Sequence, residues 1–226
     1  MSHRGLVKGV ARGPETAEDD MNMMFATNVT GLVNMTQEVL RGMLRRNNEA
    51  GAGDIINIGS IAGREPYPGG GIYCATKVAV GAFADRLRKE LIATRVRVIC
   101  VDPGQVETEF SVVRFYGDNS KADAVYAGCE PLTADDIAEA VVFTVGRREN
   151  VVVADSLIFP DHQAGATTMH KKTWFLDGVC KFFCGAGDLE ILVAAYSRSI
   201  DTTTSTRRAQ KNRTRGWVPK RLIIDE

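Results

Sequence analysis

The sequence predicts an α/β fold in which parallel strands alternate with helices. Three observations lead to this prediction. Segments with helical spacing of apolar residues alternate with short β-branched runs, the connections between them are short, and the runs are bounded by glycine or proline. The chain has 226 residues, which is enough for one substantial core, so one main domain is expected.

The first long helix is predicted from apolar residues that recur at steps of three and four. Thr16 is expected to cap its acidic start, and the basic pair Arg45 and Arg46 suits its end, ahead of the glycines at 51 and 53. The apolar face is formed by Val29, Leu32, Val33, Val39, Leu40 and Met43, with Thr36 among them.

The remaining elements follow in regular order. Glycine or proline closes the strands, and Asp102-Pro103-Gly104 is expected to stop the second one because proline cannot continue a central ladder. Parallel strands joined in this way form a Rossmann-like sheet with flanking helices, whose sites lie at the carboxyl ends of the strands. The predicted elements are a strand at 54–58, a helix at 73–93, a strand at 96–101, a helix capped by Thr133, and a strand at 151–159.

Composition excludes several classes of partner. Lysine plus arginine and aspartate plus glutamate each number 28, so no global field attracts nucleic acid or an anionic membrane surface. No apolar run is long enough to span a bilayer, and no signal peptide is recognisable, which favours a cytoplasmic location. The five cysteines are scattered and suit reduced thiols, and we expect no metal site, including at Cys180 and Cys184.

Three polar side chains are expected to meet at the carboxyl edge of the sheet. Ser60 follows the first strand, while Tyr73 and Lys77 lie one turn apart at the start of the next helix. A nearby ammonium favours the phenolate, so Lys77 is expected to lower the pKa of Tyr73 and allow acid/base catalysis near neutrality. Ser60 would bind the same substrate oxygen. The accompanying hydride requires a nicotinamide cofactor.

A tyrosine followed by lysine four residues later is also common by chance, and alone it would indicate a solvated helix face. The context argues against coincidence: a serine lies beyond one strand, the pair opens the next helix, and the following strand ends in Pro103-Gly104.

Four segments resemble the short-chain dehydrogenase/reductase family. The resemblance covers about residues 5–164, and segments 63–68 and 157–160 point to the NADP-dependent 3-hydroxy acid dehydrogenase subgroup. It implies NADP as cofactor, with NAD left open, a small hydroxy acid or similar alcohol as substrate, and a homodimer or homotetramer. The four segments are 28–31, 57–63, 73–77 and 102–110.

The resemblance also implies roles for individual residues. Tyr73 would be the acid/base, Ser60 the anchor of the substrate oxygen, and Lys77 the group that binds the nicotinamide ribose. Asn28 would hold a water that relays protons from Lys77, although a polar residue inside a helix is an equally good interpretation. The nicotinamide would be lined by Pro103, Gly104, Val106 and Thr108, of which Thr108 also suits a local cap.

The family's glycine-rich pyrophosphate turn has no counterpart in the sequence. Glycines 51 and 53 precede a strand rather than follow one, and glycines 69–71 lie in the active-site loop. We therefore expect a fold that lacks the N-terminal dinucleotide-binding strands, with residues 1–164 as the family domain and 165–226 as a largely disordered tail. An incomplete gene model would explain both ends. The alternative to an enzyme is an inactive remnant or oligomerisation module without cofactor binding.

Overall fold

The computed structural model describes residues 5–48 and 50–172. Twelve elements occur in these residues. In chain order they are η1 (Gly13–Glu15), α1 (Glu18–Phe25), the π-helical segment η2 (Ala26–Gly31), α2 (Leu32–Leu44), β1 (Ala52–Ile58), η3 (Ile61–Gly63), α3 (Gly71–Glu90), β2 (Arg95–Pro103), α4 (Glu109–Arg114), α5 (Asn119–Tyr126), α6 (Ala134–Val145) and β3 (Asp155–Ile158).

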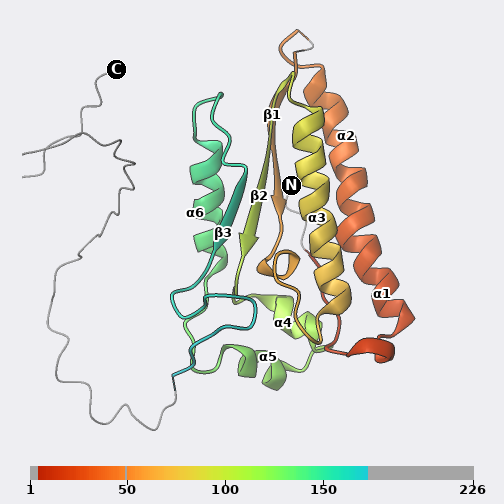
Figure 1. Cartoon of the computed structure of the whole chain (residues 1–226), viewed down its shortest axis with the longest axis vertical. Coiled ribbons are helices and arrows are strands. Elements are labelled where there is room, and N and C mark those ends of the chain that lie inside the picture. The colour runs from red at the N-terminus through yellow and green to blue at the C-terminus, as the bar shows by residue number, and fades with distance from the viewer. Residues whose placement is uncertain (1–4, 49, 173–226) are drawn as a thin grey trace, which may run out of the picture. The chain divides into compact units, whose positions relative to one another are not determined.

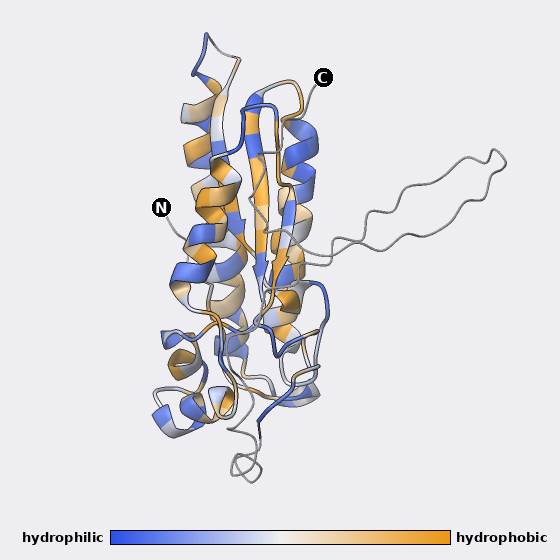
Figure 2. Ribbon diagram, turned by 90° about the vertical axis from the view of Figure 1, so that its left-hand side faces the viewer, coloured by the Kyte–Doolittle hydropathy of each residue, from blue (hydrophilic) through white to orange (hydrophobic). Residues whose placement is uncertain are grey.

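The strands form one parallel sheet in the order β1-β2-β3, as the alternation of elements predicts. Helices α2 and α3 cover one face and α6 covers the other (Figure 1). Hydrophobic residues recur along both the strands and the helices of these layers (Figure 2). A core of Ile55, Leu87, Val96 and Val98 with their neighbours fills the space between the sheet and α3. The predicted Rossmann-like α/β fold is confirmed.

The first helical region differs from the single long helix that the apolar spacing predicts. The helix is interrupted by η2, a π-helical turn, between α1 and α2. The prediction that Thr16 caps the helix is wrong, because the N-cap is Ala17 and no side chain accepts a hydrogen bond there. Three acidic residues in the first turn, which suit the positive end of the helix dipole, stand in place of a cap.

Strand β2 extends through Asp102 and Pro103, beyond the predicted stop at residue 101. In this part of β2, the N–H groups of Cys100 and Gly104 point toward β3 and bond to Ala154 and Ile158. The backbone nitrogen of Pro103 faces the β1 side of the strand. It lies beyond Ile58 and Val101, the last residues that pair β1 with β2. Its missing N–H therefore costs no ladder hydrogen bond, which is why proline is tolerated.

Two further expectations, the cap at Thr133 and the reduced thiols, agree with the structure. Thr133 does cap α6, in a capping box with Asp136. The helices α4 and α5 lie below the carboxyl ends of the strands in Figure 1. Cys74, Cys100 and Cys129 are free thiols, as expected. Cys180, Cys184 and the tail from residue 173 lie outside the described residues.

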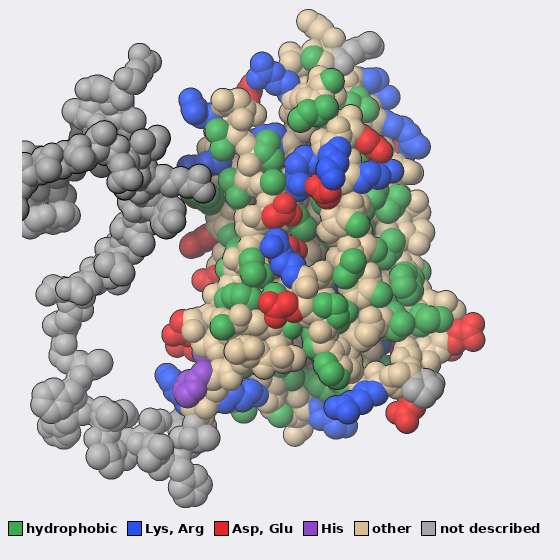
Figure 3. Space-filling view, in the orientation of Figure 1, with side chains coloured by type: hydrophobic (Ala, Val, Ile, Leu, Met, Phe, Trp, Pro, Cys, Tyr) green, Lys and Arg blue, Asp and Glu red, His purple; other side chains and the backbone are tan. Residues whose placement is uncertain are grey.

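Basic and acidic side chains are interspersed on the face shown in Figure 3. In the part of the chain that the structure describes, no helix is both long and apolar enough to cross a membrane.

Arg97 ties strands β1 and β2 to the end of α6. Its guanidinium on β2 makes two hydrogen bonds to Asp54 on β1, Nε to Oδ1 at 2.6 Å and Nη2 to Oδ2 at 2.8 Å. It also donates to the carbonyls of Val145, Arg147, Arg148 and Val151. The side chain is only 10% exposed, so its loss would leave a partly buried carboxylate and several carbonyls without a donor.

Replacing Arg97 by glutamine should lower the free energy of unfolding by about 2–4 kcal/mol. The matched control is Arg95→Gln on the same strand, because Arg95 pairs with Glu149 at the exposed surface. The control should change stability by less than about 1 kcal/mol. Urea unfolding of the three proteins measures both effects. Equal losses for the two variants would contradict the role assigned to Arg97.

Candidate active site

The predicted residues Ser60, Tyr73 and Lys77 meet beyond the carboxyl end of β1. Ser60 follows the last residue of the strand by two positions, and its hydroxyl hydrogen-bonds with the Tyr73 phenol. Lys77 lies on the next turn of α3, and its Nζ donates a hydrogen bond to the Ile58 carbonyl at 2.8 Å. The strand end and the first turns of α3 thus hold the three side chains together.

Tyr73 is buried in a small apolar cluster. Val7, Met24, Ala62 and Cys74 pack in this cluster, and the ring of Phe110 meets the Tyr73 ring edge-on with centroids 5.5 Å apart. Burial raises the pKa of the Tyr73 phenol well above its ordinary value, because the phenolate loses solvation. The hydrogen bond from Ser60 acts in the opposite direction. The phenol is therefore protonated at neutral pH in the structure.

Lys77 is a buried ammonium, 5% exposed. Burial lowers its pKa from 10.5 to about 8, and the negative charges that Cys100 and Asp102 would carry oppose this shift. Its Nζ lies 5.8 Å from the centroid of the Tyr73 ring. The sequence assigned the lowering of the Tyr73 pKa to Lys77. In the structure the groups that lower it are Ser60 and Arg114, and burial outweighs them.

Asn28 lies in the π-helical turn η2 and is almost fully buried. Its Nδ2 donates to the Leu6 carbonyl at 2.7 Å and to Thr76 Oγ1 at 3.0 Å, and its Oδ1 accepts from Leu6 N–H at 2.6 Å. Both amide hydrogens are used, so the side chain clamps the segment around Leu6 to helix α3. A water at Asn28 would have to be bound through an oxygen atom.

Asp102, which sequence reasoning missed, organises the loop that carries Ser60. Its Oδ1 accepts the Ser60 N–H at 3.1 Å, and its Oδ2 forms an ion pair with Arg64 at 2.6 Å. A side chain at Gly59 would collide with this carboxylate, so glycine is required where the loop passes over it. Only the pairing of two strand ends, Ile58 with Val101, brings Asp102 to Ser60.

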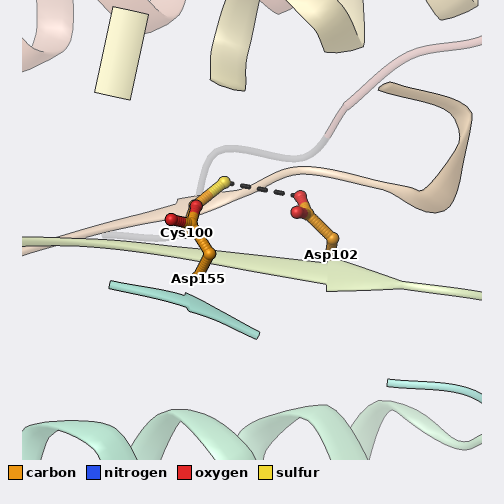
Figure 4. A group of neighbouring side chains, drawn as sticks. All are labelled: Cys100, Asp102 and Asp155. Atoms are coloured by element: carbon orange, nitrogen blue, oxygen red, sulfur yellow. Dashed lines mark hydrogen bonds between the residues drawn. The ribbon is translucent and has the colours of Figure 1, made fainter. Parts of the chain in front are cut away.

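Cys100, Asp102 and Asp155 form a group whose ligand atoms lie within 4.8 Å of one another (Figure 4). Its members already have protein partners. Burial raises the pKa of the Cys100 thiol to about 12, and its sulfur lies 3.4 Å from Asp102 Oδ1. Asp102 pairs with Arg64, and Asp155 lies 3.6 Å from Arg88. Asp102 is the member of this group that also accepts the Ser60 N–H.

The residues predicted to line the nicotinamide follow β2. Pro103 is buried at the strand end, and Gly104 lies so close to the Gln163 side chain that a Cβ would collide with it. Val106 forms a short parallel bridge with Leu132. Thr108 is the N-cap of α4 and accepts the Phe110 N–H at 3.3 Å. The local cap that the sequence suggested for Thr108 is therefore present.

A pocket of about 330 Å³ is lined by residues 11–13, by Thr16, by residues 67–69, and by Gly71 and Ile72, the two residues before Tyr73. A smaller space lined by Tyr73 itself shares five of these residues. No sequence pattern predicts this wall, because it combines two loops with the start of α3. The spacing of Phe110 and Arg114, four residues apart, was the available sign that α4 turns one face toward the site.

The fold and the site define a Rossmann-like α/β protein with a serine and a buried tyrosine and lysine at the carboxyl edge of its sheet. The family model for short chain dehydrogenase matches residues 5–116. The chain belongs to the short-chain dehydrogenase/reductase family.

Similar proteins cover most of the described residues. An NADP-dependent 3-hydroxy acid dehydrogenase of Schizosaccharomyces pombe is 52% identical over 172 residues, 76% of this chain and 65% of that protein. Sulfoacetaldehyde reductase 2 of Chromohalobacter salexigens is 42% identical over 161 residues, 69% of this chain and 62% of the relative. The chain thus spans slightly less than two thirds of these relatives.

A solved structure, the closed form of serine dehydrogenase complexed with NADP+, is 40% identical. It superposes with a TM-score of 0.69, and the match covers 75% of this chain and 67% of the serine dehydrogenase chain.

The lowered pKa of Lys77 makes stability depend on pH in a defined direction. Between pH 8 and 10.5 the unfolded chain keeps the lysine proton while the folded chain loses it. The contribution of Lys77 to the free energy of unfolding therefore increases with pH. Relative to Lys77→Met, the wild type should gain roughly 2–3 kcal/mol between pH 7.5 and 10. Cys100 and Tyr73 are present in both proteins, so their titrations cancel. Urea unfolding measures this difference. A difference in free energy of unfolding between the two proteins that stays constant from pH 7.5 to 10 would contradict the assignment.

Proposed function

We propose that the chain is an NADP-dependent oxidoreductase that interconverts a hydroxyl and a carbonyl group on a small hydroxy acid. The observation that carries the proposal is the hydrogen-bonded pair of Ser60 and buried Tyr73, with the Lys77 ammonium one turn away. The 3-hydroxy acid dehydrogenase relative and the NADP+ complex of serine dehydrogenase support the choice of substrate class and cofactor.

In the direction of reduction, Tyr73 acts as the acid. Its protonated phenol donates to the carbonyl oxygen of the substrate as negative charge develops there. The Ser60 hydroxyl donates a second hydrogen bond to the same oxygen and holds it near the phenol. In the direction of oxidation the same groups act in reverse, and the phenol must first lose its proton. Burial disfavours that loss.

The residues at the nicotinamide end fit NADP. The Lys77 ammonium has three hydrogens, of which one goes to Ile58, and a ribose hydroxyl can accept another. A Cβ at Gly5 would lie 2.8 Å from Lys77 Nζ, so the absence of a side chain there leaves room for the ammonium. When bound, NADP supplies or accepts the hydride. Pro103, Gly104, Val106 and Thr108 would line the nicotinamide.

The pyrophosphate end has no counterpart among residues 5–48 and 50–172. Neither β1 nor β2 is followed there by a glycine-rich turn that opens a helix against a phosphate. No described residue is proposed to contact the pyrophosphate end of NADP. The preference for NADP over NAD is supported by the relatives.

Proton exchange at the site is assigned to Lys77 and Asn28. An ammonium with a pKa of about 8 loses and regains a proton close to neutral pH. Lys77 can therefore pass protons between Tyr73, by way of the ribose hydroxyl, and solvent. Oδ1 of Asn28 is the side-chain atom that can accept a water on this path.

An inactive remnant or an oligomerisation module is the competing function. Exposed apolar side chains on α2 and α3, namely Met35, Val39 and Val78, would support assembly of either an enzyme or such a module as a homodimer or homotetramer. Cofactor binding separates the two functions.

Titration with NADPH, followed by its fluorescence, should show saturable binding to the wild type and to Tyr73→Phe alike. With a 3-oxo acid as substrate, Tyr73→Phe should lower kcat at least about 100-fold, because the phenol donates a proton and contributes little to cofactor affinity. Arg41→Gln, at an exposed ion pair on α2, is the control and should retain wild-type kcat. No saturable binding at millimolar NADPH would refute the enzyme function in favour of the remnant.

A further inference from the structure

The segment that follows β3 folds back on itself and carries a buried glutamine, Gln163. This residue forms an antiparallel bridge with Met169, and the next residue, Ala164, donates its N–H to the Thr168 carbonyl at 3.0 Å. The Gln163 N–H donates to the Pro160 carbonyl, also at 3.0 Å. These backbone bonds fix the position of Gln163, and the residue is only 6% exposed.

The side chain of Gln163 uses both ends of its amide. Oε1 accepts the Gln105 N–H at 2.7 Å, and Nε2 donates to the Gly165 carbonyl at 2.9 Å. A Cβ at Gly104 would collide with Oε1, so glycine at this position lets the side chain reach the backbone of the loop. An amide bonded at both ends has one favoured orientation. The Gln105 N–H therefore has a fixed acceptor from a residue 58 positions later in the chain.

The loop that follows β2 depends on two partners for the backbone of Gln105. Gln163 accepts its N–H, and the Leu132 N–H donates to its carbonyl at 3.0 Å. The Leu132 carbonyl also accepts the Glu107 N–H at 2.8 Å. Without Gln163, the Gln105 N–H would lose its acceptor in a half-buried position. An unpaired donor away from water is unfavourable enough to change the conformation of a loop.

His162 is the other side chain of this segment that contacts Gln105. Its Nε2 lies 3.1 Å from Gln105 Oε1, while Gln105 Nε2 donates to the Val125 carbonyl at 3.0 Å. These contacts hold the Gln105 side chain, whose torsions can adjust if one contact is lost. Gln163, in contrast, acts on the backbone of the loop.

We propose that Gln163 is a positioning residue of the active site, which fixes the loop 103–106 in the conformation that lines the nicotinamide. The inference rests on the proposed function, because it concerns one wall of the cofactor site. Gln163 acts through the Gln105 backbone and takes no part in the transfer of a proton or hydride. The same segment also reaches the serine loop, since Glu65 Oε2 accepts the Ala166 N–H at 2.8 Å. One turn of the chain thus connects both loops of the site.

The first test measures the contact itself in the 226-residue chain without cofactor. Gln163→Met keeps the length of the side chain and removes both hydrogen-bonding atoms. Amide exchange followed by NMR should be roughly 10-fold faster at Gln105 in this variant, because the amide loses its acceptor. The Gly104 amide, which donates to the Ile158 carbonyl, is the internal control and should keep its rate. His162→Phe should keep the wild-type rate at both amides.

The second test extends the comparison to the cofactor. Gln163→Met should raise the Kd and the KM for NADPH about 10-fold, because binding must then order the loop. At saturating NADPH, kcat with a 3-oxo acid should stay within about threefold of the wild type, since Gln163 does not touch the reacting groups. Arg41→Gln, at an exposed ion pair on α2, should match the wild type in every measurement.

The outcomes separate this inference from the proposed function. Unchanged exchange at Gln105 in Gln163→Met would overturn the inference, as would an equal acceleration at Gly104 or in His162→Phe. Wild-type NADPH binding and turnover in Gln163→Met would also overturn it and leave the oxidoreductase function intact. A wild-type chain that binds no NADPH, but whose Gln105 amide is exposed by Gln163→Met, would support the positioning of the loop and refute the oxidoreductase function.

Discussion

The hydrogen bond from Lys77 to the Ile58 carbonyl joins helix α3 to the end of strand β1, and the geometry of the site depends on it. A buried ammonium is costly unless it is hydrogen-bonded, so this contact fixes how far along the strand the helix lies. With that register set, Tyr73 one turn earlier meets Ser60 two residues beyond the strand end. The same burial that lowers the pKa of Lys77 raises that of Tyr73, which separates the two groups into a proton-exchanging amine and a proton-donating phenol.

Two polar side chains extend this arrangement to the neighbouring segments. Asp102, at the end of β2, holds the Ser60 backbone and the Arg64 side chain, so the serine loop is tied to the second strand as well as the first. Asn28 holds the segment around Leu6 against α3 beside Lys77. Each is almost fully buried and hydrogen-bonded, which makes the site a rigid constellation on strand ends and helix starts.

The sequence predicted the order of the elements and the residues of the constellation, because periodicity and spacing are local properties. Ser60, Tyr73 and Lys77 could be found since each follows a recognisable strand or opens a recognisable helix. Asp102 and Tyr67 could not, because their roles arise from strand pairing and loop contacts far apart in the chain. The capping of α1 was mispredicted where acidic residues of the first turn replace a side-chain cap. The effect of Lys77 on Tyr73 was overestimated, since spacing on a helix gives proximity but not burial.

The proposed function requires that a hydride reaches a carbonyl carbon held between Ser60 and Tyr73 of this chain. Incubation with NADPH that carries deuterium at C4 of the nicotinamide, together with the 3-oxo acid malonate semialdehyde, tests it directly by mass spectrometry of the product. The account predicts 3-hydroxypropanoate with deuterium at C3 for the wild type, and loss of this product in Tyr73→Phe. Absence of deuterated product from the wild type at saturating concentrations, or its undiminished formation by Tyr73→Phe, would contradict the account.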